Sequence, residues 1–590
     1  MLTRLQVDGF KNLLGLDVHF GPYTCIAGPN AVGKSNVFDA IEFLSLLADH
    51  TFLEATQRLR LRGGQVVDPR SLFWNNAESS DPVISFGVEM IVPSEVTDDF
   101  GREVSATTTF LRYDLKLRYL PPDPDSPQIG RIQLEHEKLT HINLGDAHKH
   151  LPWPHSKKKF RDTVVRGRRA GTAYISTRQG EDGEAVVNVH QDGGSRGKPR
   201  PSAAARAPRT IVSTTTAADD QTILSARREM QQWRLLALEP SAMRAPDSTL
   251  DDPHPTTSGA HLAATLYRMA REQGDDVYAE VASEAAALTD IRGITVDYDE
   301  RRDALTLMAS MGTGPWLPAR SLSDGTLRFL TLCIMRVDDS FGGLLCMEEP
   351  ENGIHPARIE AMVDLVRSLA VDPQDPPGPG NPMRQVMVNT HSPHFVRYHS
   401  DNLLAAVPTR VRRDGRIATT VQLRPLPGTW QAIQGARTVL KASMSDYLTE
   451  PPNTLLSLEA VSWPPGVFPS HACSKVHPTR DSSRTWKPCW CISAPRKPPA
   501  CRTPGRARFP PGYGSCARRK QERGSTWCSS TGTPTVLTAR DGNARSAAEL
   551  RKAVSRIRSS LSFRSRKPRP GFSSMNRRSG TSWHPKGNNP

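Results

Sequence analysis

The residues whose types and spacing point most directly to chemistry lie between positions 28 and 35, in the sequence GPNAVGKS. This stretch fits the phosphate-loop pattern G-x-x-x-x-G-K-[ST] at every fixed position. Small residues in such a loop let backbone N–H groups close around phosphates, and the following helix directs its positive dipole end at them. We expect Lys34 to reach the β- and γ-phosphates of a nucleotide and Ser35 to bind Mg²⁺. The other predicted ATP contacts are Gly28, Asn30, Gly33 and Asn36.

Two elements must position this loop, a strand before it and a helix after it. Residues 23–27 (YTCIA) have the apolar character of a short buried strand, and residues 36–44 have the apolar spacing of a helix. A phosphate loop needs strand, loop and helix in this order, so the context supports a nucleotide site.

Two later stretches carry residues that could act on a phosphate. Residues 322–326 (LSDGT) precede an apolar helix-like run, and residues 342–356 (GGLLCMEEPENGIHP) predict a strand that ends at Glu348 and Glu349. Open α/β sheets bind ligands outside the carboxyl ends of their strands. A carboxylate at such an end, beside a phosphate loop, is placed to act as general base for an attacking water.

A third stretch, residues 385–393 (QVMVNTHSP), predicts another buried strand that ends near His391. A lone histidine is more often structural, but one that follows an apolar strand end is better interpreted as a site residue. His355 and His394 are interpreted as structural residues that shape turns.

These four stretches (residues 28–35, 322–326, 342–356 and 385–393), in this order, resemble the motifs of the ATP-binding-cassette (ABC) type ATPase head of the SMC, RecF and OLD-like proteins. The resemblance is greatest to short AAA-family ATPases whose Walker B region reads E-E-P-E-N-G-hydrophobic-H-P. It covers the two ends of residues 1–400 closely and the middle loosely. It implies an α/β fold, an ABC-type P-loop head with an inserted β-rich lobe, which binds ATP and Mg²⁺ and forms a homodimer with ATP between the heads.

The resemblance also implies roles for single residues. Glu349 would be the general base, and His391 the switch histidine that senses the γ-phosphate. Glu348 would support the metal through water, although the family more often has Asp at that position. Ser323 and Gly325 would form the signature, here S-D-G-T rather than S-G-G-Q, which closes on a nucleotide held by a second subunit. Lys11 and Asn12 match the basic position beside the nucleotide, and no Q-loop glutamine is assigned.

Charge is distributed unevenly along the 590 residues. The net charge is +15, but residues 471–590 hold 26 Lys+Arg against 4 Asp+Glu, which leaves 50 against 57 for residues 1–470. The basicity therefore belongs to the tail, and a nucleic-acid role cannot be argued from the overall charge.

Cysteine usage and hydropathy indicate the compartment. Cys25, Cys333 and Cys346 precede the tail, two of them in apolar runs, and they are interpreted as core residues in a reducing compartment. The chain begins with an alternating, strand-like pattern and has no run of 18 apolar residues. We expect a soluble cytoplasmic protein with no membrane partner.

The length allows three or four domains. The sequence predicts the N-terminal part of the head at 1–80, a β-rich lobe with a basic flexible insertion at 81–221, a helical lobe with the C-terminal part of the head at 222–425, a connector at 426–470 and a tail at 471–590.

Periodicity predicts the main elements of these segments. We expect an antiparallel sheet over 82–145, helices over 225–238 and 259–288, and a hairpin from 295–298 and 305–308. No sustained heptad repeat occurs between the phosphate loop and position 320, so the coiled-coil arms of SMC-type proteins are not predicted.

The basic insertion, residues 151–210, holds 13 Lys+Arg against 5 Asp+Glu. One interpretation is a solvated, partly mobile segment, and the other is a contact for the phosphate backbone of DNA or RNA.

The tail holds only 8 Ile+Leu+Val among residues 471–590, so we expect disorder. Its six Cys and four Trp are unusual for a disordered segment, and the hypothesis is a frameshift after roughly 450–470. A basic nucleic-acid arm and a zinc module are the alternatives, although the paired C-x₂-C spacings of zinc sites are missing. The tail also lacks the D-x-D pair of a TOPRIM nuclease domain.

Two functions follow from these patterns. The first is an Mg²⁺-dependent ATPase in DNA repair, DNA maintenance or phage defence, with DNA at the basic insertion. The second is an ATP-gated assembly switch with low turnover, which controls a partner effector protein and has no direct DNA role.

Overall fold

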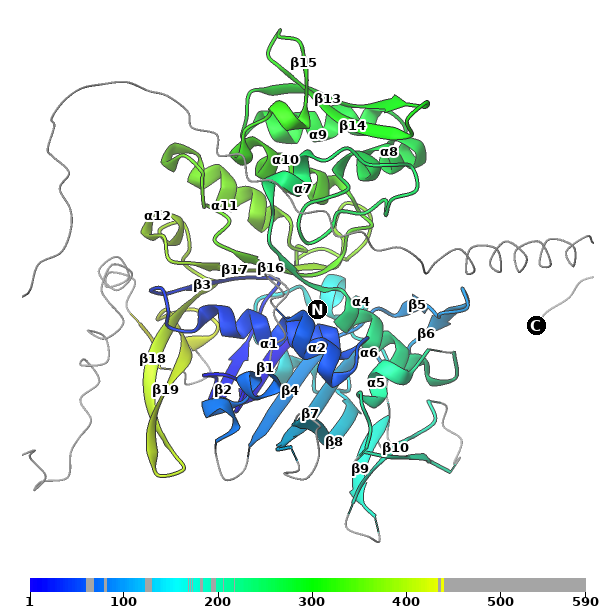
Figure 1. Cartoon of the computed structure of the whole chain (residues 1–590), viewed down its shortest axis with the longest axis vertical. Helices are drawn as coiled ribbons and strands as arrows, with labels where there is room; N and C mark the ends of the chain where they lie inside the picture. Colours follow the sequence, from blue (N-terminus) through cyan, green and yellow to red (C-terminus); the bar gives the residue numbers. More distant parts are fainter. Residues whose placement is uncertain are drawn as a thin grey trace, which may run out of the picture. The chain divides into compact units, whose positions relative to one another are not determined.

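Two large β-sheets, two small ones of three and two strands, and the helices packed against them form the described part of the chain (Figure 1). The computed structural model describes residues 1–439 apart from residues 60–67, 79–81, 123–129, 168, 170, 172, 181–183, 193–197, 205, 217 and 433–436. The predictions for residues 471–590 and for most of the connector lie outside these described residues.

The six-stranded sheet carries the phosphate loop. Its order is β12-β16-β17-β3-β18-β19, and its neighbours pair in parallel except for the antiparallel hairpin β18–β19. The strands are β12 (Trp233–Leu236), β16 (Gly343–Glu348), β17 (Arg384–Thr390), β3 (Tyr23–Ala27), β18 (Leu403–Arg413) and β19 (Arg416–Pro425). The loop follows β3, next to the ends of β17 and β16.

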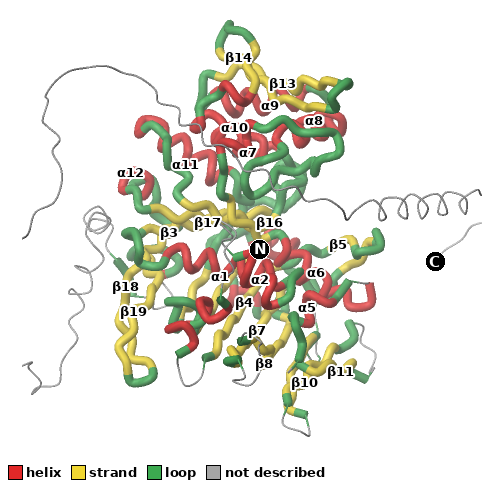
Figure 2. Tube along the Cα trace, in the orientation of Figure 1, coloured by secondary structure: helices red, strands yellow, loops and turns green. Residues whose placement is uncertain are grey.

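Both faces of this sheet are buried, which explains the continuous apolar runs of its strands. Ile26 belongs to one hydrophobic core, while its neighbours Cys25 and Ala27 belong to the other. Helix α1 (Lys34–Leu47) contributes to the first core, and α10 (Asp324–Val337) and α11 (Ile359–Ser368) contribute to the second. Figure 2 shows α1 on one side of the central strands and α10 and α11 on the other.

The second sheet has eight antiparallel strands in the order β11-β10-β9-β8-β7-β4-β1-β2. Its strands are β1 (Leu2–Asp8), β2 (Leu16–His19), β4 (Val83–Ile91), β7 (Phe110–Leu120), β8 (Arg131–His141), β9 (Ile175–Gln179), β10 (Ala185–Val189) and β11 (Arg200–Ala203). The sheet predicted over 82–145 is thus present, but β1 and β2 belong to it as well. The lobe is continuous with the start of the chain because β4 pairs with β1.

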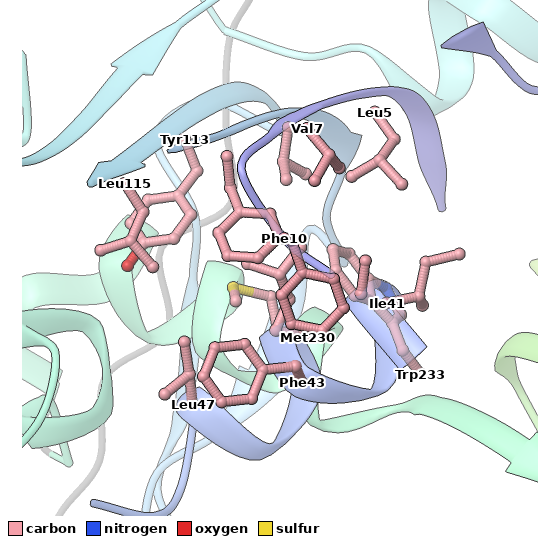
Figure 3. Packing of buried hydrophobic residues seen from close by; sticks show 14 of the residues in the cluster. Leu5, Val7, Phe10, Ile41, Phe43, Leu47, Tyr113, Leu115, Met230 and Trp233 are labelled. Carbon is pink, nitrogen blue, oxygen red and sulfur yellow. The ribbon is translucent and has the colours of Figure 1, made fainter. Parts of the chain in front are cut away.

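The inner face of the large sheet packs on α1 and on α6 (Gln221–Gln231), as Figure 3 shows. Phe10 lies among the rings of Phe43 and Phe86, with ring centroids 5.8 and 5.7 Å away, and Met230 of α6 joins the same cluster. This cluster fixes α1, and hence the phosphate loop at its start, on the sheet.

Side chains connect the two large sheets at several points. Gln385 of β17 accepts the N–H of Leu2 on β1 at 2.8 Å and donates to the Leu2 carbonyl at 2.7 Å. Thr420 forms a similar pair of contacts. Thr420 of β19 accepts a hydrogen bond from the Leu14 N–H at 2.9 Å and donates to the Leu14 carbonyl at 3.3 Å. Hydrogen bonds between side chains and backbone groups thus hold the two sheets together.

Two helix predictions differ in their bounds. The helix expected over 225–238 ends at Gln231, and residues 233–236 form β12, because these residues pair in parallel with β16. The helix expected over 259–288 is divided into α8 (Leu262–Gln273) and α9 (Asp276–Ala286) at Gly274, whose φ of 97° a helix cannot accommodate. The predicted hairpin is present as β13 (Ile291–Asp299) and β14 (Ala304–Met311) and is extended by β15 (Trp316–Pro318).

The described parts of the basic insertion are packed as well as solvated. Trp153 and Phe160 are buried against each other with ring centroids 5.5 Å apart, while Lys157 and Lys158 are exposed. Lys159 forms a salt bridge of 2.8 Å with Asp375.

Cys25, Cys333 and Cys346 are free and buried, as expected of core residues. Burial raises the pKa of the Cys333 thiol to about 12. Within the described ranges, no helix has the length and apolar character needed to cross a membrane.

Candidate active site

A pocket of about 760 Å³ lies at the carboxyl ends of β16 and β17, beside the phosphate loop. Seven of the predicted site residues line it: Asn30, Gly33, Lys34, Ser35, Asn36, Glu348 and Glu349. The opposite wall comes from residues 235–239, at the end of β12 and directly after it, and from α10. The strand order therefore brings together groups more than 300 positions apart in the sequence.

Glycines shape the loop where other residues would not fit. Gly33 precedes α1 with a φ of 102°, and a Cβ there would lie 2.3 Å from Nδ2 of Asn12. Gly28 donates its N–H to the Thr390 carbonyl at 3.2 Å, and a Cβ would lie 3.0 Å from Ala406. The loop is thus pressed against β17 and β18.

Lys34 is 6% exposed, and its Nζ donates to the carbonyls of Gly28 at 2.7 Å and Pro29 at 2.8 Å. Burial lowers the pKa of Lys34, and the nearby carboxylates of Glu349 and Glu348 oppose this shift. Among the described residues Lys34 forms no ion pair, so its charge is available to an anion in the pocket.

Two contacts tie the first turn of α1 to the segment before the loop. Asn36 donates to Asn12 Oδ1 at 2.7 Å, and Asn12 donates to the Val32 carbonyl at 3.3 Å. Lys11 forms a salt bridge of 2.6 Å with the buried carboxylate of Asp39. Asn12 therefore fixes the loop, while Lys11 is engaged with the helix behind it.

The two adjacent carboxylates diverge at the end of β16. Glu348 accepts a hydrogen bond from the amide of Asn389 on β17 at 3.3 Å. Glu349 has a φ of 47°, and its N–H donates to the Asn389 carbonyl at 2.9 Å. A left-handed conformation costs a residue with a side chain about 1–2 kcal/mol, which this turn must offset.

Glu349, which lines the pocket, is paired with His391. His391 Nδ1 lies 2.5 Å from Glu349 Oε1, and the amide of Asn352 donates to Glu349 Oε2 at 3.2 Å. The side chains of Glu349 and His391 are 27% and 41% exposed, so neither is sealed in the core. Both predicted residues are brought together, from different strands.

Glu351 is a residue of this region that the sequence reasoning missed. It is 8% exposed and accepts a hydrogen bond from the Thr390 hydroxyl, which in turn accepts the Ser392 N–H at 2.9 Å. Burial raises the pKa of Glu351. The contact fixes the backbone on both sides of His391.

Ser323 and Gly325 do not line this pocket. Ser323 caps α10, with its hydroxyl accepting the Thr326 N–H at 3.2 Å, and its side chain is exposed. A Cβ at Gly325 would approach the Gly353 carbonyl to 3.5 Å, which is ordinary contact. The structure thus separates the predicted signature from the phosphate loop of its own chain.

Arg328, Asn352 and Asn389 line the pocket and were also missed. Arg328 lies on α10, five positions after Ser323, and its Nη1 donates to the Asn352 carbonyl at 3.1 Å. The only available signal for Arg328 was a charge within an apolar helical run.

Ser35 and Glu348 fit an Mg²⁺ ion by chemistry, because they offer hydroxyl and carboxylate oxygens to the same pocket. Asp247, Asp251 and His261 form a separate cluster of possible metal ligands. In that cluster Asp247 accepts the N–H groups of Ala263 and Ala264 at 3.0 and 3.1 Å, so it serves as a cap for α8.

Comparison with protein-family models matches residues 221–397 to the family described as "AAA domain, putative AbiEii toxin, Type IV TA system". The matched residues include Ser323, Glu349 and His391 but not the phosphate loop. A search of curated proteins found no match.

The solved structures with similarity include SMC heads. A crystal structure of the Smc head bound to the C-terminal winged-helix domain of ScpA is 11% identical with a TM-score of 0.34, over 71% of this chain and 97% of that chain. A head with an extended coiled coil, bound to the C-terminal domain of ScpA derived from Pyrococcus furiosus, is 10% identical with a TM-score of 0.34, over 71% and 96%. The SMC head domain from Thermotoga maritima is 11% identical with a TM-score of 0.29, over 71% and 98%. Similarity at this level carries no function to this chain.

The family match and the phosphate loop together support a mixed α/β P-loop ATPase of the AAA/ABC type that binds ATP. They do not distinguish the SMC, RecF and OLD-like groups.

Proposed function

We propose that this chain is an Mg²⁺-dependent ATPase. One observation carries the proposal. The pocket that holds Lys34 and Ser35 also holds Glu349, and His391 lies 2.5 Å from that carboxylate. A cation for phosphate and a base for water are the two groups that phosphoryl transfer to water requires.

In this reaction the oxygen of a water attacks the γ-phosphorus of ATP, and the bond to the β-phosphate oxygen breaks to give ADP and phosphate. Glu349 takes the proton of the water, and Lys34 neutralises charge on the β- and γ-phosphates. Ser35 and Glu348 would hold Mg²⁺, which supplies further charge neutralisation. His391 shares the Glu349 carboxylate and is proposed to sense the γ-phosphate.

Replacing the base tests the proposal. Glu349→Gln is expected to lower kcat for ATP hydrolysis by about 10²- to 10⁴-fold, because an amide cannot accept the proton. Binding of a fluorescent ATP analogue should change little. Measured phosphate release that continues at the wild-type rate in the variant would refute the role of Glu349.

We further propose a homodimer in which Ser323 and Gly325 complete the site of the partner. Both lie outside the pocket of their own chain, and Ser323 is exposed. Mixing Lys34→Ala with Ser323→Asp tests this, because a mixed dimer has both defects in one site and none in the other. Equal mixing should restore about one quarter of wild-type hydrolysis from two inactive variants. No recovery, although mixed dimers form, would place Ser323 in its own subunit's site.

The proposed setting is DNA repair, DNA maintenance or phage defence in the cytoplasm, with DNA at the basic insertion. The exposed side chains of Lys157 and Lys158 support such a contact. Hydrolysis stimulated by duplex DNA, with stimulation that falls steeply as salt rises, would favour this setting.

The second candidate is an ATP-gated assembly switch that controls an effector protein. The observation in its favour is that the groups of the pocket are already engaged. Lys34 is held by two carbonyls, and both carboxylate oxygens of Glu349 have hydrogen-bond partners. Assembly that depends on ATP, measured by light scattering, with slow turnover and no effect of DNA, would favour the switch.

A further inference from the structure

Helix α10 is connected to the candidate base through two contacts. Arg328 of α10 donates from Nη1 to the Asn352 carbonyl at 3.1 Å. Asn352 donates from its amide to Glu349 Oε2 at 3.2 Å. The orientation of the Glu349 carboxylate, which follows strand β16, is therefore linked to a different element, helix α10.

Asn352 holds both the backbone and the side chain of Glu349. Its N–H donates to the Glu349 carbonyl at 2.9 Å, which closes the turn in which Glu349 has a φ of 47°. Its amide holds Oε2, while His391 lies at Oε1. Truncation of the Asn352 side chain would thus free the carboxylate on one side, while the backbone N–H of residue 352 would still close the turn.

Arg328 has a feature that packing alone does not explain. Its Nε is buried without a hydrogen-bond partner among the described residues. An unsatisfied buried donor is unfavourable, and native structures contain few of them. The guanidinium is nevertheless kept at the pocket wall, where its other end reaches the turn of the base.

We propose that Arg328 and Asn352 are positioning residues that set the Glu349 carboxylate from helix α10. This inference rests on the proposed ATPase function and concerns regulation of the same site. Ser323, at the exposed start of α10, lies five positions before Arg328. A ligand or second subunit that moves this helix changes the position of the base through the two contacts.

The test uses full-length protein and steady-state ATP hydrolysis. Asn352→Ala and Arg328→Gln are each expected to lower kcat by about 100-fold with little change in KM, because they misplace the base without touching the phosphate-binding groups. The double variant should lose no more than the worse single variant, since both act through one contact. Arg336→Gln is the matched control, because Arg336 lies on the same helix and contacts Glu284 and Ser368 away from the pocket. It should retain wild-type kcat.

The separation of kcat from ATP binding distinguishes positioning from a structural role. Misplacement of the base lowers kcat and leaves the affinity for a fluorescent ATP analogue unchanged, whereas a general loss of structure lowers both.

The outcomes are distinguishable. If wild-type protein hydrolyses ATP and Glu349→Gln does not, but the Arg328 and Asn352 variants keep full kcat or lose activity additively, this inference fails and the ATPase proposal stands. An Arg336→Gln variant as inactive as Arg328→Gln would also overturn it. If wild-type protein does not hydrolyse ATP, both proposals fail together.

Discussion

Gly33 is the position in the phosphate loop where a single added methyl group is least tolerable. Its φ of 102° lies in a region that side chains avoid, and the Cβ would lie 2.3 Å from the Asn12 amide that fixes the loop. Gly33→Ala is expected to weaken binding of a fluorescent ATP analogue by at least about 10-fold, with little loss of helix content. Gly15→Ala is the control, because φ is 63° there but a Cβ would meet nothing within 4 Å. Equal affinity in both variants would contradict the expectation.

At the same scale, the candidate site was predictable only in part. Lys34 and Glu349 were identified because each lies in a polar or glycine-containing stretch that comes directly after an apolar strand, so the sequence shows where the strand ends. Asn352 and Glu351 were missed because their contacts depend on a left-handed turn at Glu349, which the sequence E-E-P-E-N-G does not specify. Arg328 was missed because its partner is a backbone carbonyl, and such contacts leave no pattern of complementary charges.

Among the elements, helix α10 has an N-cap residue, Ser323, for which two separate roles can be tested. The Ser323 hydroxyl caps the helix, so Ser323→Ala should lower the free energy of unfolding by about 1 kcal/mol. Ser323→Asp keeps a capping oxygen and should retain wild-type stability, but it places negative charge where a second subunit's phosphates are proposed to lie. Urea denaturation and ATP hydrolysis should therefore distinguish the two variants. Ser323→Asp should be as stable as wild type but inactive, and Ser323→Ala should be less stable.

The contradictory outcome is full hydrolysis by Ser323→Asp, which would leave this serine with the capping role alone.

The elements themselves were largely predictable where local pattern decides. The strand–loop–helix unit around residues 23–47 and the hairpin of β13 and β14 follow from apolar spacing. The error at residues 233–236 has a tertiary cause. These four residues continue a helical pattern, but as a strand they pair with the edge of β16, whose backbone groups a lengthened α6 would leave without this partner.

On the scale of the whole molecule, one buried carboxylate connects the large sheet to residues 211–212, which follow its last strand in the sequence. Glu137 of β8 is fully buried and accepts the N–H groups of Ile211 and Val212 at 2.7 and 3.0 Å and the Tyr113 hydroxyl at 3.1 Å. Burial raises the pKa of Glu137 to about 7, although these three donors favour the charged form.

A pH dependence of stability follows. Because the folded-state pKa of Glu137 exceeds that of the unfolded chain, the native state binds more protons below pH 7, and lowering the pH from 8 to 6 should stabilise the fold. The slope due to this group approaches at most about 1.4 kcal/mol per pH unit. Urea denaturation of wild-type protein and Glu137→Gln at both pH values measures it, since the difference isolates this carboxyl. Parallel pH dependence in the two proteins would contradict the assignment.

The arrangement of the large sheet could not be predicted from sequence. The local pattern of residues 82–145 indicates antiparallel strands, but nothing in it indicates that β4 pairs with β1 across some 80 residues. Such a pairing is decided by the shared core around Phe10, to which both strands contribute.

The strand order of the smaller sheet also constrains how the protein can be made. β17 lies between β3 and β16, so the strand that leads into the phosphate loop cannot be joined to β16 and the proposed base until residues 384–390 have been synthesised. At about 5–20 residues per second, a ribosome takes roughly 20–70 seconds to synthesise the chain between these partners. During that time β3 must be shielded by α1 and the first strands of the large sheet. A chain released between positions 350 and 384 would carry Lys34, Glu348 and Glu349 and still have no means of bringing them together.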